Sequence, residues 1–358
     1  MPDGEADGAI PRHDMGHRAR ACVLGWVPLQ SRPVPVRLLA KQFLAIARLT
    51  ALEAIRQPIC LLLAGTCILF IALLPVLIMH QMGESQKLIR DSALATHFVF
   101  GLLFAGYAAC AAVQHELRRG TIASVLTKPV GRELFFVAKF FGIAAVLLLF
   151  SLGVTIATLL SARMAAESYT VDWWAGGPQF IAIGAAVLVA LFLNYFTRQP
   201  FVSTTFGLLI IFLLLAFGIS SMLGTDGQLV PFGAAVTWKL VPASILVTLA
   251  LLVLAGVAVG LATRLDTVPT LAICSVVFLV GLMSDYLFGR IAADHSWAAV
   301  IYGLLPNWQH FWMTDALSGD EGMIPWDYVV HAAGYAGCYL AGVLCWGILS
   351  FRRIELQG

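Results

Sequence analysis

Long apolar runs constrain this chain more than any other feature of its sequence. Several runs reach about 20 residues with few or no charged side chains, enough to cross about 30 Å of hydrocarbon as helix. Hydrophobic residues make up 60% of the 358 residues, whereas a soluble domain has roughly 45–50%. A transmembrane β-barrel would show segments of about 10 residues with alternating polarity, and that pattern is absent. We therefore predict an all-α polytopic membrane protein.

The apolar runs divide the chain into three parts. Residues 1–33 are polar and predict a disordered cytoplasmic tail. Residues 34–57 alternate apolar and basic side chains at helical period, which predicts an amphipathic helix in the membrane interface. Residues 58–358 form the predicted transmembrane domain. We expect about eight spans in it: residues 59–79, 93–113, 134–160, 179–196, 201–223, 242–262, 268–288 and 329–351.

The distribution of Lys and Arg predicts which side each loop faces. With a cytoplasmic N-terminus, 17 of the 22 basic residues fall in inside segments and 5 in outside segments. Cytoplasmic loops carry such an excess, so we expect both termini in the cytoplasm and the chain in the cell (inner or plasma) membrane. Seven tryptophans fall in or beside the outside loops, as an interfacial aromatic belt requires.

The outer region near the C-terminal span has a pattern of its own. Residues 296–312 are moderately apolar, too short to span, and interrupted at Leu305-Pro306-Asn307. This predicts a re-entrant hairpin or an interfacial helix on the outer side.

Absent motifs limit the chemistry of this chain. It has no G-x-x-x-x-G-K-[ST] loop for nucleotide phosphates, no H-E-x-x-H and no G-x-S-x-G. Its basic residues are scattered singly or in pairs, so we expect no nucleic-acid partner. Within the predicted spans, Lys139 is expected to reach the interface and Asp285 to be a polar helix end. We predict no catalytic, cofactor or metal site.

Residues 116–133 form a polar island between two apolar runs. They carry two acidic and four basic residues in a chain that is only 12% charged. Residues 121–127 are long enough for one or two helical turns, after which Pro129 and Gly131 turn the chain back. A short helix across the ends of two spans is a handle, because anything that pushes it moves both spans. The same pattern also fits an ordinary loop anchored by positive charge.

A recognisable pattern runs through this segment and into the next apolar run. Its residues are Glu116, Arg118-Arg119-Gly120-Thr121, Val125-Leu126, Lys128-Pro129, Arg132-Glu133, Lys139 and Gly142. The pattern resembles the cytoplasmic coupling loop of type-2 ABC transporter permeases, and the copper-enzyme-maturation permease group is the nearest general likeness. Ala138 stands where that family usually has glycine. Three further stretches resemble the interfacial helix, the outer re-entrant region and the C-terminal ending of such permeases: residues 50–58, Leu305-Pro306-Asn307 and residues 351–355.

The resemblance implies the membrane-spanning subunit of an ATP-driven transporter, directed toward export. A separate P-loop subunit would bind ATP and dock on the 116–133 segment, and a second permease copy would complete the membrane domain. The implied docking residues are Glu116, Arg118, Arg119, Gly120, Thr121, Leu126, Lys128, Pro129 and Arg132. Two alternatives stay open: a membrane-embedded enzyme whose dispersed polar residues converge, and a non-transporting scaffold or assembly factor.

Overall fold

The arrangement of the helices comes from a computed structural model. The structure describes residues 36–78, 85–119, 131–165, 171–225, 227–292, 294–317 and 322–354. The chain divides into two units, residues 1–41 and 42–358. Only residues 36–41 of the first unit are described, and they begin a helix. Residues 42–358 form the helical bundle.

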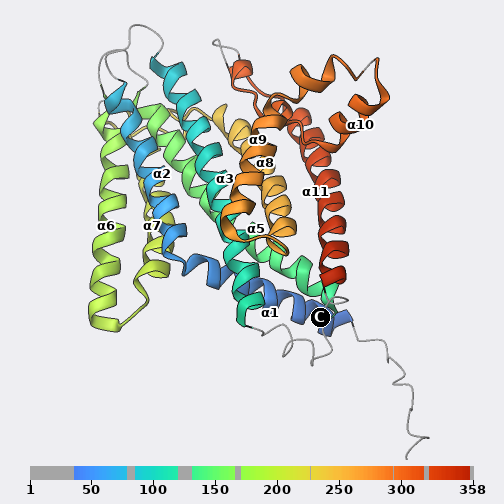
Figure 1. The fold of residues 1–358 in the computed structure, drawn as a ribbon. Coiled ribbons are helices and arrows are strands. Elements are labelled where there is room, and N and C mark those ends of the chain that lie inside the picture. The colour runs from blue at the N-terminus through green and yellow to red at the C-terminus, as the bar shows by residue number, and fades with distance from the viewer. Residues whose placement is uncertain are drawn as a thin grey trace, which may run out of the picture. The chain divides into compact units, whose positions relative to one another are not determined.

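The described residues fold into helices, which confirms the predicted all-α class (Figure 1). Their one strand-like feature is an isolated β-bridge between Leu223 and Leu229. The α-helices are α1 (Val36–Ile55), α2 (Pro58–Leu77), α3 (Ser85–Arg119), α5 (Arg132–Met164), α6 (Trp173–Thr197), α7 (Phe201–Ser220), α8 (Leu240–Ala262), α9 (Thr267–Leu282), α10 (Ser296–Leu304) and α11 (Trp326–Ile354). Three short elements follow α9 or α10: the π-helix η1 (Asp285–Gly289) and the 3-10 helices η2 (Trp308–Phe311) and η3 (Asp315–Leu317).

Seven of the described helices are long and apolar enough to cross a membrane: α2, α3, α5, α6, α7, α8 and α11. The predicted span at residues 268–288 instead forms α9, an apolar helix of 16 residues. At 1.5 Å per residue α9 is about 24 Å long, shorter than a hydrocarbon core of roughly 30 Å. The chain continues beyond it through η1, where the turns widen.

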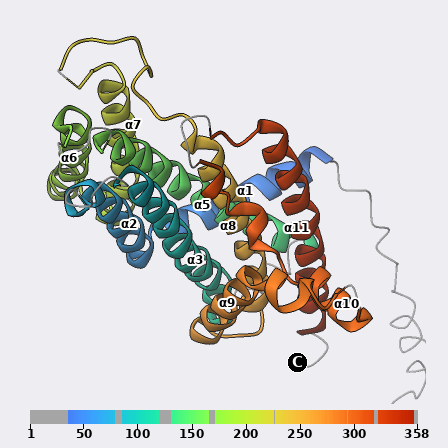
Figure 2. The ribbon, with the colours of Figure 1, turned by 90° about the horizontal axis from the view of Figure 1, so that it is seen from above.

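Burial separates the middle of the bundle from its edges. In the most apolar stretches of α3 and α5, 72% of the residues are buried, compared with 17% in α6 and α11. Seen from above, α3, α5 and α8 lie between the α6–α7 pair and α11 (Figure 2). The exposed face of α6 carries large apolar side chains such as Ile181 and Leu188, as a lipid-facing helix does.

Glycines bring α8 and α11 close together. A Cβ at Gly256 would stand 2.6 Å from Leu340 Cδ1, and one at Gly260 would stand 2.9 Å from Trp346 Cζ3. The G-x-x-x-G spacing in α8 therefore allows the backbones of two apolar helices to approach, where larger side chains would hold them apart.

The lower end of the bundle in Figure 1 is where α3 ends and α5 begins. Residues 42–55 of α1 run across the helix ends there instead of along the bundle (Figure 1). Their exposed side carries Leu44, Leu49 and Leu52 together with Arg48. Apolar and basic side chains on one exposed surface are what an interfacial helix presents to a membrane.

At the upper end, the segment after α10 folds back onto α9. The indole N–H of Trp308 donates to the Val277 carbonyl over 3.3 Å, and Gly281 leaves the space that the ring fills. Trp308 is fully buried, so its predicted place in an interfacial belt is wrong: it is a core residue. The belt at this end consists of five exposed tryptophans: Trp173, Trp174, Trp238, Trp297 and Trp326.

Candidate functional site

The predicted docking residues lie at the lower end, and the structure describes only part of them. Glu116, Arg118 and Arg119 belong to the end of α3, and Arg132 is the first residue of α5, with side chains outside the description. Residues 120–130 lie outside the described residues, and with them the predicted short coupling helix. They include the other docking residues: Gly120, Thr121, Leu126, Lys128 and Pro129. The two helices that flank this segment, α3 and α5, are described.

A buried lysine ties the two helices that flank the 116–133 segment. Lys139 of α5 is only 3% exposed, and its Nζ donates to the Ala112 carbonyl of α3 over 2.7 Å. Its ammonium group also lies 5.3 Å from the centroid of the Phe135 ring. Hydrogen bonds to charged groups contribute about 1.5–3 kcal/mol. The expectation that Lys139 reaches the interface is therefore wrong, because a carbonyl of the neighbouring helix lies within its reach.

Gln114 joins α3 to the turn between α8 and α9. Its Nε2 donates to the Leu265 carbonyl over 2.7 Å, and its Oε1 accepts from Thr267 Oγ1 over 3.0 Å. In the same turn, Arg264 donates to the Ser350 carbonyl of α11 over 3.2 Å. Side-chain hydrogen bonds thus link the lower ends of helices that lie far apart in the sequence.

Helix α1 packs directly on α5 beside the lysine tie. A Cβ at Gly142 would stand 2.5 Å from the Ala47 carbonyl oxygen and 2.7 Å from Thr50 Cβ, so a side chain there would push α1 away. The rings of Phe43 and Phe141 meet edge to face at 5.5 Å next to this contact. Gly142 also belongs to the permease-like pattern, and the structure gives it a packing reason.

A small cleft opens between α1 and α3 at the same place. Its volume is about 150 Å³, below the roughly 300–1,000 Å³ of ligand pockets, so it suits a side chain or a few waters. Its lining includes Ala112, whose carbonyl accepts the Lys139 bond. Glu53 and Arg56 give the cleft one charge of each sign. Among the described residues, no three His, Cys, Asp or Glu side chains gather as a metal centre would require.

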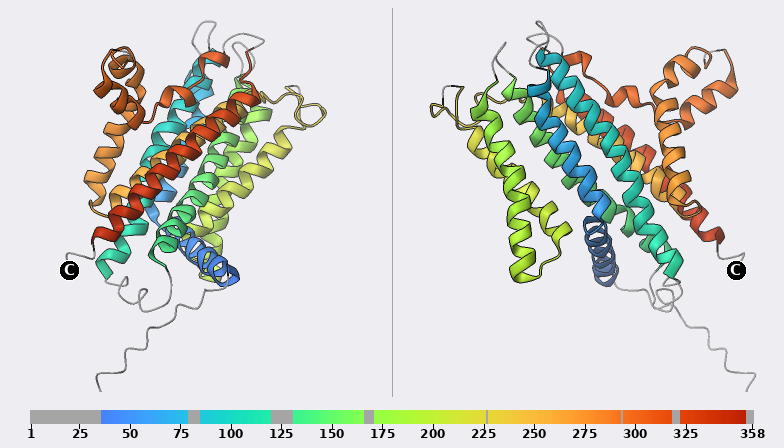
Figure 3. Two further views of the ribbon diagram at one scale, coloured as in Figure 1. Left: turned by 90° about the vertical axis from the view of Figure 1, so that its right-hand side faces the viewer. Right: turned by 60° about the vertical axis from the view of Figure 1, so that its left-hand side comes forward.

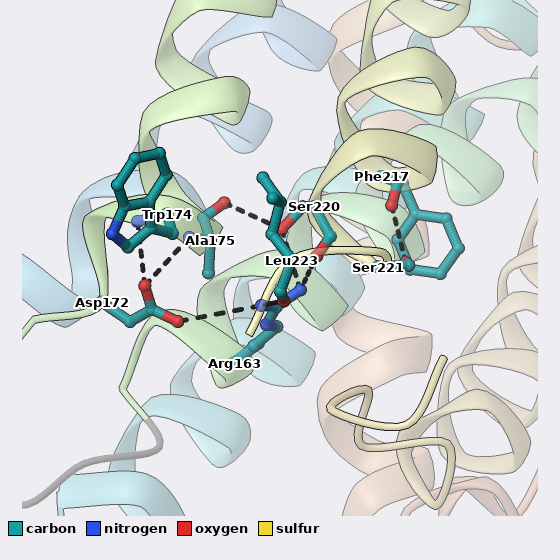
Figure 4. Close-up of polar contacts among 8 residues, drawn as sticks. All are labelled: Arg163, Asp172, Trp174, Ala175, Phe217, Ser220, Ser221 and Leu223. Carbon is teal, nitrogen blue, oxygen red and sulfur yellow. Dashed lines mark hydrogen bonds and ion pairs between the residues drawn. The ribbon is translucent and has the colours of Figure 1, made fainter. Parts of the chain in front are cut away.

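At the upper end, a buried ion pair joins α5, α6 and α7 (Figure 4). Arg163, in the last turn of α5, is 2% exposed, and its Nη2 lies 3.9 Å from Asp172 Oδ2. The guanidinium also donates to the carbonyls of Ser220 and Leu223, where α7 ends. Asp172 caps α6 by accepting from the Trp174 N–H over 2.8 Å. The pair therefore satisfies backbone groups that two helix ends leave open.

Sequence reasoning places Arg163 among the loop cations and does not find this pair. The available signal was Asp172, a preferred capping residue directly before the apolar run of α6. Arg163 carried no such signal, because its carbonyl partners lie 57 and 60 residues further along the chain.

A second polar cluster holds the upper end of α9. Asp285 Oδ1 accepts from Tyr302 Oη over 2.5 Å and from Asn307 Nδ2 over 3.1 Å. The Asn307 backbone N–H donates to Tyr335 Oη over 3.2 Å, which links the cluster to α11. The hydrogen bond to Asp285 raises the pKa of Tyr302, because the phenol donates to a carboxylate only while it is protonated.

A histidine and a serine meet inside the bundle. His97 Nε2 lies 3.1 Å from Ser151 Oγ, and the side chains are 0% and 2% exposed. The other ring nitrogen of His97 has no hydrogen-bond partner among the described residues. A nucleophilic pair needs substrate access and a third group that orients the histidine. Burial keeps substrate away from His97 and Ser151, and the described residues include no group that hydrogen-bonds to the other ring nitrogen of His97.

The sequence of this chain matches the model of a known protein family. A family model described as "ABC-2 family transporter protein" matches residues 44–230, which are 187 of the 358 residues. The matched range includes the 116–133 segment, the helices on both sides of it and the contact between α1 and α5. No curated protein and no solved structure matches the chain. The chain belongs to the ABC-2 transporter family, as a multi-pass membrane permease.

Proposed function

We propose that this chain is the membrane-spanning subunit of an ATP-driven exporter. A separate P-loop subunit would bind and hydrolyse ATP, because this sequence has no G-x-x-x-x-G-K-[ST] loop. That subunit would dock on the 116–133 segment. The proposal rests most on the Lys139–Ala112 hydrogen bond, which joins the two helices on either side of this segment.

The polar ties indicate how a push on the segment would spread. Lys139 holds α3 and α5 together just above it, so the two helices would move as a unit. Gln114 would carry the displacement to the α8–α9 turn, and the contact at Gly142 would carry it to α1. Closely packed helices rearrange between discrete states, which is how closure at one end opens a path at the other.

In this proposal the lower end faces the cytoplasm, where ATP is available. The 17-to-5 distribution of Lys and Arg supports that orientation. Localisation in the cell membrane, export and pairing with a second permease copy come from the family resemblance.

The alternative of a membrane-embedded enzyme rests on the His97–Ser151 pair. A serine-reactive probe separates the two functions. An enzyme would lose labelling and activity in Ser151→Ala, whereas a permease would keep ATPase binding and ATP-dependent transport in that variant. The burial of His97 and Ser151 favours the permease, because an enzyme's nucleophile must be reached by its substrate.

Co-purification with the P-loop protein encoded next to this chain tests the docking claim. Arg119→Glu places an acid where docking needs a base, so we expect at least about tenfold less ATPase to co-purify. Thermal unfolding of the purified chain should not change. The matched control is Lys87→Glu, an exposed charge reversal near the other end of the same helix α3, which should leave ATPase binding intact.

The docking claim fails if reversals at Arg118, Arg119 and Lys128 leave both ATPase binding and ATP-driven transport unchanged. An ATPase that binds at this segment while no cargo moves would favour the scaffold function.

A further inference from the structure

The turn between α6 and α7 is an exposed tip at the lower end (Figure 3). Every residue from 194 to 200 is exposed. Three aromatic side chains and one cation form what we call the turn patch: Phe192, Tyr195, Phe196 and Arg198. The Phe196 ring lies 4.4 Å from that of Phe192 and 5.0 Å from that of Tyr195, between ring centroids.

The position of the turn patch indicates a membrane boundary. Both α6 and α7 are apolar enough to span, so the turn lies where lipid chains give way to headgroups. Tyr195 is 80% and Phe196 65% exposed, which water alone would disfavour. Aromatic side chains next to an arginine are typical of the level at which headgroups begin.

Arg198 has no ion-pair partner among the described residues. The sequence from residue 173 to 225 contains no Asp or Glu, so neither α6 nor α7 offers one. Helix α2, which packs on both, carries no charged residue. Helix α5, which also packs on both, carries one acidic residue, Glu133 in its first turn, and no ion pair joins it to Arg198 among the described residues. Arg198 is therefore an exposed positive charge with no ion-pair partner among the described residues, close in sequence to three exposed aromatic side chains.

The turn is held without the Arg198 side chain. Asn194 Nδ2 donates to the Gln199 carbonyl over 2.7 Å, and Thr197 Oγ1 donates to the Leu193 carbonyl over 2.6 Å. Arg198 itself caps α6 with φ at 54°, a left-handed conformation in which glycine is the ordinary residue. The guanidinium thus has no hydrogen-bond or ion-pair partner within the described ranges, and it presents a planar set of donors that matches phosphate oxygens.

We propose that the turn patch binds the phosphate of an anionic phospholipid in the leaflet at the lower end. Arg198 is the phosphate ligand, and the rings of Tyr195 and Phe196 lie against the glycerol and the first carbons of the acyl chains. The charge selects the lipid class, because the ammonium of a zwitterionic lipid already neutralises its own phosphate. The site stands whether or not the chain is an exporter, since it rests on the turn and not on the 116–133 segment.

The test is lipid binding to the purified full-length chain, followed by native mass spectrometry and thermal unfolding. Phosphatidylglycerol should bind and raise the melting temperature more than phosphatidylcholine at equal concentration. Arg198→Gly should weaken phosphatidylglycerol binding about fivefold, because a basic residue near an anionic surface contributes about 1 kcal/mol. Without lipid the variant should melt no lower than the wild type, because glycine suits the left-handed position. Arg198→Lys keeps the charge but loses the planar donors, so it should bind phosphatidylglycerol more weakly than the wild type and more tightly than Arg198→Gly.

The matched control is Arg290→Ala at the upper end. Arg290 is also exposed and beside an aromatic ring, 5.2 Å from the centroid of Tyr286, but outside the turn patch. It should leave phosphatidylglycerol binding unchanged. Inorganic phosphate at the same concentration should not displace the lipid.

Three results would overturn the proposal. They are wild-type phosphatidylglycerol binding in Arg198→Gly, an equal loss in Arg290→Ala, and displacement by inorganic phosphate, which would mark a site for the free anion.

Discussion

Two buried charged side chains in this protein form hydrogen bonds with backbone groups at helix ends. Arg163 and Asp172 close two helix ends and face each other, although each is almost fully buried. We expect Asp172→Asn to lower the free energy of unfolding by about 3 kcal/mol, because it leaves Arg163 without its counter-charge. Asp172→Ala should cost about 1 kcal/mol more, since it also removes the cap of α6. Thermal unfolding of the purified variants measures both.

The control for this prediction is Asp327→Asn, an exposed acid in the first turn of α11 that should shift stability by no more than about 0.5 kcal/mol. Equal stability of Asp172→Asn and the wild type would mean that the ion pair contributes nothing.

Tyr302 makes the free energy of unfolding depend on pH in the alkaline range. The folded-state pKa of its phenol is raised by the bond to Asp285, so this stabilisation is complete below the ordinary pKa of about 10 and is lost as pH rises further. Tyr302→Phe should lower the free energy of unfolding by about 1 kcal/mol at neutral pH. Between about pH 9 and 11 the variant should lose less stability than the wild type. Parallel losses in both proteins would exclude the bond as the cause.

At the scale of elements, the contact of α1 with α5 depends on the absence of one side chain. Gly142→Ala should force the two helices apart and lower the melting temperature, although alanine favours helix over glycine by about 1 kcal/mol. Gly65→Ala in α2 is the matched control, because a Cβ there meets nothing within 4 Å. It should leave the melting temperature unchanged or raise it. Similar effects of the two substitutions would contradict the tight contact.

At the scale of the whole molecule, the proposed orientation places the two ends of the bundle on opposite sides of a membrane. In a background without Cys22, Cys338 and Cys345, a membrane-impermeant maleimide should label Arg290→Cys in intact cells. It should label Arg198→Cys only after the cells are permeabilised. Labelling of Arg198→Cys in intact cells would reverse the orientation and move the 116–133 segment away from ATP.

The sequence by itself determined the helical class, the position of most of the spanning helices and the family resemblance. A chain in hydrocarbon must satisfy its backbone hydrogen bonds within each segment, so composition and run length are enough to predict spanning helices. The permease-like pattern was readable in the same way, because its residues from Glu116 to Gly142 are neighbours in the chain. The docking residues remain a prediction, since residues 120–130 lie outside the described part of the protein.

Only the tertiary structure decided where the buried polar groups and the interrupted helix lie. Lys139 bonds to Ala112, Arg163 to the end of α7, and Trp308 to α9, and each partner lies tens of residues away in the chain. Helix α9 ends before its apolar run does, where Gly281 admits Trp308 and η1 begins. An apolar stretch of sequence does not indicate such contacts, because they depend on which helix ends the fold brings together.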